Sequence, residues 1–168
     1  MATVRAYCGA LVFALLAGCA SYDGRGLVPG KSTGAEVEAL MGAPALRVAN
    51  ADGSNTWLFP RGPGGRHTYA VAVGADGVMR GIEQRLTLEN VKKLMPGQST
   101  AKQVRELMGP PNLIARAAFK PLDVWEYRTM HYQEKRVLWV EFSDDGIVRG
   151  VIEMHDFESD EPSGPDFL

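Results

Sequence analysis

The chain repeats one stretch, VEALMGAP at residues 37–44, as VRELMGPP at residues 104–111. A second repeated stretch precedes it: PGKST at residues 29–33 recurs as PGQST at residues 96–100. Two further pairs follow in the same order: NTWLF with DVWEY, and DGVMRGI with DGIVRGV. Four matching blocks in one order predict two copies of a single structural unit.

Each copy carries the signature of a short helix. Thr33 followed by Glu36, and Thr100 followed by Gln103, fit the capping box, in which two side chains satisfy free backbone amides at a helix start. Apolar residues then recur at helical spacing: Val37, Leu40 and Met41 in the first copy, and Val104, Leu107 and Met108 in the second. The glycine and proline that close each stretch end the helix. Thr87 is a candidate cap for one more short helix before the second copy.

Three strands are expected after each helix. They lie near residues 55–60, 66–74 and 77–86 in the first copy, and near 123–131, 135–143 and 146–154 in the second. Asp76-Gly77 and Asp145-Gly146 predict hairpin turns, since glycine accepts positive φ without steric cost. The predicted fold class is therefore α+β, a tandem repeat of a small unit in which a helix precedes a three-stranded antiparallel sheet.

Alternation along the strands predicts which side chains form the core. The expected core positions are Trp125, Tyr127, Leu138, Val140, Phe142, Val148, Ile152 and Met154 in the second copy, with Trp57, Phe59, Tyr69, Val71 and Val73 in the first. The opposite face of the second sheet is expected to hold Glu126, Arg128, Trp139, Glu141, Arg149, Val151 and Glu153. The matching positions of the first copy are Leu58, Ala70, Ala72, Arg80 and Ile82.

The first residues indicate a leader that is removed. Arg5 precedes an apolar run at residues 10–16, and small residues follow, as in a secretory signal. Leu16-Ala17-Gly18-Cys19 resembles the bacterial lipobox, which implies that Cys19 is acylated and opens the mature chain. The alternative is an ordinary secretory leader with Cys19 an incidental thiol. Because Ala20 follows the cysteine, the resemblance implies the outer membrane, with the protein facing the periplasm.

These observations divide the chain into five segments. The expected division is a signal peptide at residues 1–18, a lipidated tether at 19–26, the first repeat at 27–86, the second at 87–156, and a disordered acidic tail at 157–168. Each repeat alone is close to the lower size limit for an independent core, so the two are expected to pack together, either by joining their sheets or by stacking.

No catalytic pattern, cofactor motif or metal-ligand spacing is visible in the sequence. His67, His131 and His155 fall on different strands without the spacing of a zinc site. The formal net charge of −2 gives no basic footprint for nucleic acid. The glycines and arginines of residues 60–66 join two strands and lack the lysine ending of a phosphate loop. We therefore expect neither an enzyme nor a small-molecule substrate site, but a membrane-tethered protein that binds another protein.

The candidate partner-binding residues are Trp139, Arg128, Glu126, Glu141 and Arg149. Trp139 is singled out because its repeat partner is Ala70, so the duplicated fold does not itself require an aromatic residue there. Tryptophan and arginine are enriched among residues that dominate binding energy. The alternative is that Trp139 covers apolar surface between the repeats. Trp57 and Trp125 occupy equivalent positions and are expected in the core.

The order of these blocks resembles the SmpA/OmlA (BamE) family of small outer-membrane lipoproteins. The resemblance covers about residues 27–155 and rests on Pro-Gly-x-Ser-Thr, Val-x-x-Leu-Met-Gly-x-Pro, Trp-x-aromatic and the Asp-Gly turn. It implies an accessory role in the machinery that assembles β-barrels in the outer membrane. This chain departs from the family by carrying two units, an arrangement that resembles the β-lactamase inhibitor protein. That second likeness leaves a periplasmic inhibitor or sequestering module as the alternative function.

Overall fold

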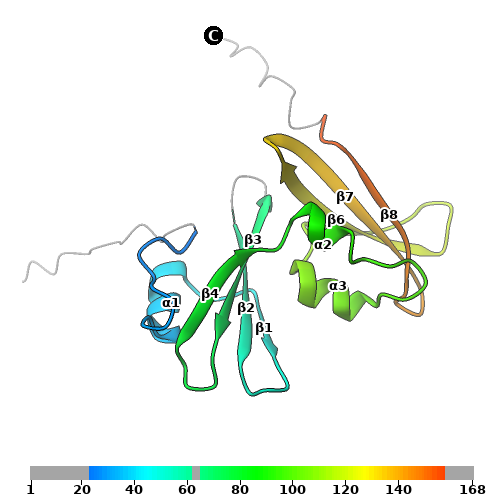
Figure 1. Ribbon diagram of the computed structural model, residues 1–168. Helices are drawn as coiled ribbons and strands as arrows, with labels where there is room; N and C mark the ends of the chain where they lie inside the picture. Colours follow the sequence, from blue (N-terminus) through cyan, green and yellow to red (C-terminus); the bar gives the residue numbers. More distant parts are fainter. Residues whose placement is uncertain (1–22, 62–64, 158–168) are drawn as a thin grey trace, which may run out of the picture.

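The computed structural model describes residues 23–61 and 65–157, which form two units of the same design (Figure 1). The first unit contains α1 (Gly34–Met41), β1 (Leu46–Ala49), β2 (Asn55–Arg61), β3 (His67–Val73) and β4 (Met79–Gln84). The second contains α2 (Leu88–Val91), α3 (Ala101–Met108), β5 (Leu113–Arg116), β6 (Leu122–His131), β7 (Glu134–Ser143) and β8 (Val148–His155). The α+β class and the tandem of two units are confirmed.

Three expected features lie outside the described residues. They are the signal peptide, the acylated Cys19 and most of the acidic tail. Among the helices of residues 23–61 and 65–157, none has the length and apolar character needed to cross a bilayer.

Both predicted capping boxes are present. The Thr33 hydroxyl accepts from the amide of Glu36 at 3.3 Å, and the Glu36 carboxylate accepts from the amide of Thr33 at 2.7 Å. Thr100 and Gln103 form the same reciprocal pair at the start of α3. Thr87 caps α2, as its position suggested. These local bonds satisfy amides that a helix start otherwise leaves free, and they fix where each helix begins.

Each unit has one more strand than the sequence indicated. The sheets are both antiparallel and four-stranded, ordered β1-β2-β3-β4 and β5-β6-β7-β8. The additional strands, β1 and β5, are only four residues long and lie at the sheet edges beside β2 and β6. The expectation of three strands was therefore incomplete, because an edge strand of four residues shows too little alternation to be recognised.

Each unit buries its own core between its helix and one face of its sheet. Val37, Met41, Phe59, Val71, Val73 and Met79 form the first core. Leu86, Val91, Leu94, Val104, Met108, Tyr127, Leu138, Val140, Phe142 and Val148 form the second. Trp57 and Trp125 pack partly buried against these cores, which confirms their expected positions. The two cores use equivalent residues of the repeat, so duplication preserved the packing as well as the sequence.

A β-bulge in each sheet changes which side chains of the last strand face the core. The register shifts between Ala72 and Val73, and again between Glu141 and Phe142. A shift of one residue moves every later side chain to the other face. The predicted facing was therefore wrong for five residues. Val151 and Ile82 pack against the cores, and Glu153 lies opposite Leu138 on the core side of the sheet, whereas Ile152 is 43% exposed and Met154 follows it outward by alternation.

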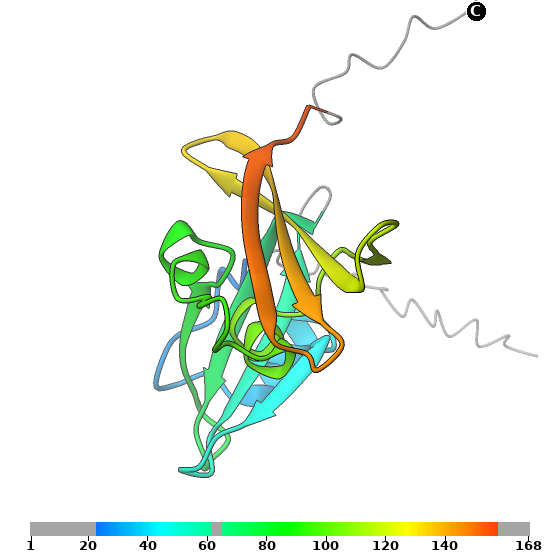
Figure 2. The same ribbon diagram turned by 90° about the vertical axis from the view of Figure 1, so that its right-hand side faces the viewer.

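The two units stack in the order α1, first sheet, α3, second sheet (Figures 1 and 2). Part of the face of the first sheet that points away from its own core is consequently covered by the second unit, whereas Ala72 on the same face stays exposed. Leu58, Thr68 and Ala70 on that face are at most 2% exposed. Leu58 and Ala70 were expected on a binding face shared with Trp139, and this expectation was wrong. They belong to the junction between the units.

A buried ion pair closes this junction. Arg66 precedes β3, pairs with Asp156 beyond β8, and donates to the backbone carbonyls of Thr129 and Arg136 at 3.1 and 3.3 Å. Arg66 and Asp156 are 5% and 2% exposed. A guanidinium can satisfy several acceptors at once from one rigid fork, so Arg66 joins both units and both strands of the β6–β7 hairpin.

Candidate protein-binding face

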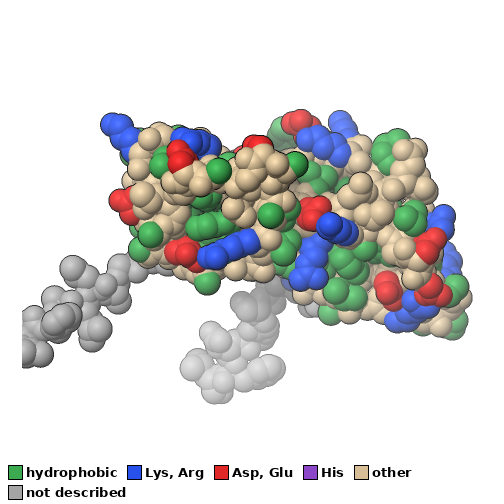
Figure 3. All heavy atoms as spheres, turned by 90° about the horizontal axis from the view of Figure 1, so that it is seen from below, with side chains coloured by type: hydrophobic (Ala, Val, Ile, Leu, Met, Phe, Trp, Pro, Cys, Tyr) green, Lys and Arg blue, Asp and Glu red, His purple; other side chains and the backbone are tan. Residues whose placement is uncertain are grey.

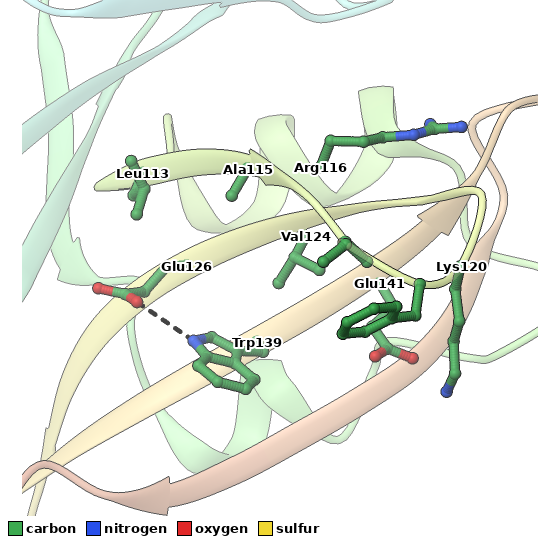
Figure 4. A pocket seen from close by; sticks show the side chains of 11 residues that line it. Leu113, Ala115, Arg116, Lys120, Val124, Glu126, Trp139 and Glu141 are labelled. Carbon is green, nitrogen blue, oxygen red and sulfur yellow. Dashed lines mark hydrogen bonds between the residues drawn. The ribbon is translucent and has the colours of Figure 1, made fainter.

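The outer face of the second sheet, which points away from α3, carries a hollow of about 400 Å³. Its floor is formed by β6 and β7, and one wall by β5 and the loop that follows (Figure 4). The residues that line it are Leu113, Ala115, Arg116, Ala117, Ala118, Phe119, Lys120, Val124, Glu126, Trp139 and Glu141. Most of this lining is apolar, with charged side chains at the rim, as is common in sites that bind another molecule.

Trp139 and Glu126 form one end of the hollow. They are cross-strand partners, and the indole N–H of Trp139 donates to the Glu126 carboxylate at 3.2 Å (Figure 4). Trp139 remains 37% exposed, so its ring covers the sheet without being enclosed. The hydrogen bond fixes the polar edge of the indole and leaves its apolar surface available for contact.

The other predicted binding residues lie around this pair. Glu141 lines the hollow next to Lys120, and neither has an ion-pair partner among the described residues (Figure 4). Arg128 donates to Glu126 at 3.4 Å and does not line the hollow. Arg149 is held at the β7–β8 turn, where it donates to Ser143 at 2.7 Å and pairs with Asp145 at 3.2 Å. The hollow therefore gathers three of the five candidates.

Sequence reasoning missed one whole wall of the hollow. Leu113, Ala115, Phe119 and Lys120 come from β5 and the loop after it. Phe119 is fully exposed and Leu113 is 55% exposed. The signal available was an apolar pair, Leu113-Ile114, which follows Asn112 and the two prolines after α3. Recognising that pair as a strand would have placed Leu113 on the same face as Trp139.

Two of the three histidines, His67 and His131, line the same hollow of about 360 Å³, whereas His155 does not. His131 contacts Glu153 at 3.0 Å, His67 stacks on Tyr69, and His155 packs edge-on against Phe157. Burial lowers the pKa of His67, because the charged imidazolium loses solvation. Across the described ranges, no group of three or more His, Cys, Asp or Glu side chains could hold a metal ion.

The charges on the surface seen from below are mixed. Acidic and basic side chains alternate over both units on this face, with apolar patches between them (Figure 3). A nucleic-acid interface would need a continuous basic stripe. The mixed charge agrees with the low net charge of the sequence.

Comparison with known proteins relates the second unit to one family. Residues 84–152 match the model for the outer membrane protein assembly factor BamE domain, which covers less than half of the chain. No curated protein matches the chain. Among solved structures, a DUF4309 family protein (YjgB) from Bacillus subtilis is similar, with 21% identity over 79% of this chain and 84% of that chain and a TM-score of 0.32. The predicted resemblance to the SmpA/OmlA (BamE) family is thus confirmed for the second unit, which carries a BamE-like domain.

Proposed function

We propose that this chain is a non-enzymatic lipoprotein of the bacterial envelope that binds a protein partner during outer-membrane assembly. Cys19 would hold it to the outer membrane, and the outer face of the second sheet would contact the partner. The observation that carries the proposal is the match of residues 84–152, the unit bearing the hollow, to an assembly-factor domain.

The chemistry of the face supports a protein partner. Leu113, Trp139 and Ile152 expose apolar surface on one side of the sheet, and Lys120 and Glu141 stand beside it. An apolar centre with a charged rim is the usual anatomy of a protein interface. A contiguous exposed apolar patch also lowers the solubility of a protein. Such a patch is therefore best explained as a surface that binds another molecule.

The proposal is tested by recovering partners from native membranes. The tagged chain is cross-linked in intact cells, and complexes are purified after the membrane is solubilised. Subunits of the barrel-assembly machinery should be recovered. Capture of a periplasmic enzyme in a one-to-one complex, with barrel assembly unchanged when the chain is deleted, would instead support an inhibitor and remove the proposed function.

Trp139→Ala is expected to reduce partner recovery at least tenfold while changing the free energy of unfolding by about 1 kcal/mol or less. The reason is that Trp139 is 37% exposed and makes one hydrogen bond, whereas truncation of a buried tryptophan costs about 3–5 kcal/mol. Partner recovery and thermal unfolding are measured on the same preparations. Phe157→Ala, which removes another exposed aromatic ring away from the hollow, serves as the control. A large loss of stability in the Trp139 variant would mean that the residue packs rather than binds.

Cys19→Ser is expected to release the protein from the membrane. A single acyl chain holds a protein only marginally, whereas several chains anchor it firmly, because each buried methylene contributes about 0.8 kcal/mol. Membrane and soluble fractions are compared by immunoblot, and the mature amino terminus is analysed by mass spectrometry. Cys8→Ser, which alters the leader alone, should leave the distribution unchanged. An unmodified thiol on Cys19 would contradict the anchor.

A further inference from the structure

The second sheet ends in an open backbone edge at β5. Within the described residues, β6 is the one strand that pairs with β5. The amide of Ala117, directly after β5, donates to the carbonyl of Leu122 at 2.9 Å. Residues that bond to the partner strand alternate with residues that do not along an antiparallel pair. The backbone N–H and C=O groups of Ile114 and Arg116 therefore point away from the sheet, and all four residues of β5 are exposed.

The first unit protects the equivalent edge with a charge. β1 corresponds to β5, and Arg47 occupies the position of Ile114. Arg47 pairs with Glu38 of α1 and lies over the ring of Trp57, 4.5 Å from its centroid. Charged side chains of this kind keep other strands away from a sheet edge. In the second unit Arg105 replaces Glu38, and Ile114 is 55% exposed, so the edge of β5 lacks this protection.

The hollow on the outer face opens beside the same edge. Leu113 and Ala115 of β5 line it together with Val124 of β6 (Figure 4). Phe119, which is fully exposed, lines it from the loop after β5. A strand added next to β5 would lie about 4.7–4.9 Å away and would project its side chains alternately to the two faces of the sheet. A side chain on the outer face would then stand beside the small Ala115 and reach over the hollow.

We propose that β5 binds an extended segment of another protein, which adds to the second sheet as a further strand and places an apolar side chain over the hollow. The unpaired backbone groups select the occupant, because their hydrogen-bonding partner is another backbone in the extended conformation. In this binding mode main-chain hydrogen bonds supply affinity, and pockets for alternate side chains supply specificity. The proposal rests on the proposed function, since it names the part of the partner that the candidate face receives. Because β5 is four residues long, the contact is expected to be readily reversible.

Titration with a synthetic peptide tests this binding mode. The full chain, purified from cells with an isotope label, is mixed with an acetylated and amidated peptide in which threonine alternates with valine around a central phenylalanine. Binding should shift the amide signals of Ile114 and Arg116 in NMR spectra and slow their hydrogen exchange. The control is the same peptide with N-methylated amides at its central residues, which keeps the side chains but removes hydrogen-bond donors from both edges. It should bind about tenfold more weakly, since main-chain hydrogen bonds are lost.

Absence of peptide binding, equal binding of the two peptides, or binding without a change at these two amides would each overturn the proposal. Slow exchange of the Ile114 and Arg116 amides in the chain alone, accompanied by dimerisation, would also overturn it, because the edge would then belong to a second copy.

Variants of β5 separate the edge from the hollow. Ile114→Pro removes an N–H that faces solvent, a change that an edge strand tolerates, and should weaken peptide binding about tenfold. Ile114→Val keeps the N–H and is the matched control with unchanged binding. Ala115→Phe fills the hollow from its own wall and should weaken binding of the phenylalanine peptide by a similar factor. Melting temperatures are compared for all three variants. If Ile114→Pro disturbs the sheet, the N-methylated peptide still decides the question on the wild-type chain.

Recovery of partners from native membranes is scored separately with the Ile114→Pro variant. A folded variant that recovers barrel-assembly subunits in wild-type yield would overturn strand addition and leave the proposed function in place. Loss of recovery in Ile114→Pro, with wild-type yield in Ile114→Val, is the result expected.

Discussion

Asp156→Ala is expected to lower the free energy of unfolding by about 3–5 kcal/mol, because it leaves the buried guanidinium of Arg66 without its counter-ion. Both side chains are nearly inaccessible to water, at 5% and 2% exposure, so solvent cannot replace the missing charge. The loss should appear in urea unfolding followed by fluorescence. Because the pair joins the two units, the same variant should also increase hydrogen exchange at the junction, in the backbone of β3 and of the β6–β7 hairpin.

An exposed ion pair of the same chain provides the matched control. Lys102 and Glu106 lie one helical turn apart on the surface of α3, 3.8 Å from each other. Glu106→Ala should change stability by about 0.5 kcal/mol or less, since exposed pairs contribute little. The double variant Arg66→Met/Asp156→Leu should recover most of the stability lost in Asp156→Ala, because an apolar pair needs no counter-ion. Equal effects of Asp156→Ala and Glu106→Ala would contradict the structural role of the buried pair.

Sequence reasoning predicted what depends on local chemistry. The capping boxes at Thr33 and Thr100, the Asp-Gly turns and the helical apolar stripes are each decided by residues within a few positions of one another. Repetition strengthened these predictions, because a pattern found twice in order is seldom accidental. The helices, six of the eight strands and most of both cores followed from them.

The facing of the last strand in each unit could not be predicted in the same way. A bulge adds one residue to one strand, and its position depends on the partner strand rather than on the local sequence. Alternation counted through Arg149 therefore placed Val151 and Ile152 on the wrong faces. As a result, Ile152, which lies opposite Trp139 on the outer face and is 43% exposed, was assigned to the core.

The arrangement of the units depends on contacts that the repeat does not encode. Arg66 and Asp156 bind across the junction, whereas the repeat carries Lys135 and Thr87 at the corresponding positions, so the carboxylate is not repeated. The sequence therefore predicted only one part of the candidate protein-binding face. Trp139, Glu126 and Glu141 were correctly grouped by alternation, while the β5 wall depended on a strand too short to recognise.

Gly109→Ala is the other substitution expected to lower the free energy of unfolding strongly. Its repeat partner, Gly42, provides the matched comparison. Gly109 has a φ of +89° and a ψ of −175°, a backbone conformation essentially restricted to glycine, and placing an L-residue there costs about 1–3 kcal/mol. The new methyl group would also lie 2.8 Å from the Thr68 side chain, which is buried at the junction and cannot move away freely. Overpacking of this kind costs about 1–3 kcal/mol, so the total expected loss is about 2–6 kcal/mol in urea unfolding.

Gly42→Ala should lower the free energy of unfolding only by the backbone contribution, about 1–3 kcal/mol. Gly42 has a similar φ of +78°, but the nearest atom to a new methyl group is a terminal nitrogen of Arg61, 3.9 Å away. Thr68→Ser, which removes the methyl group that Gly109→Ala would strike, should restore part of the stability of that variant and none of the stability of Gly42→Ala. If the two glycine variants lost the same stability, the turn after α3 would not be pressed against the first sheet. The stacked order of helix and sheet, on which the junction between the two units depends, would then be wrong.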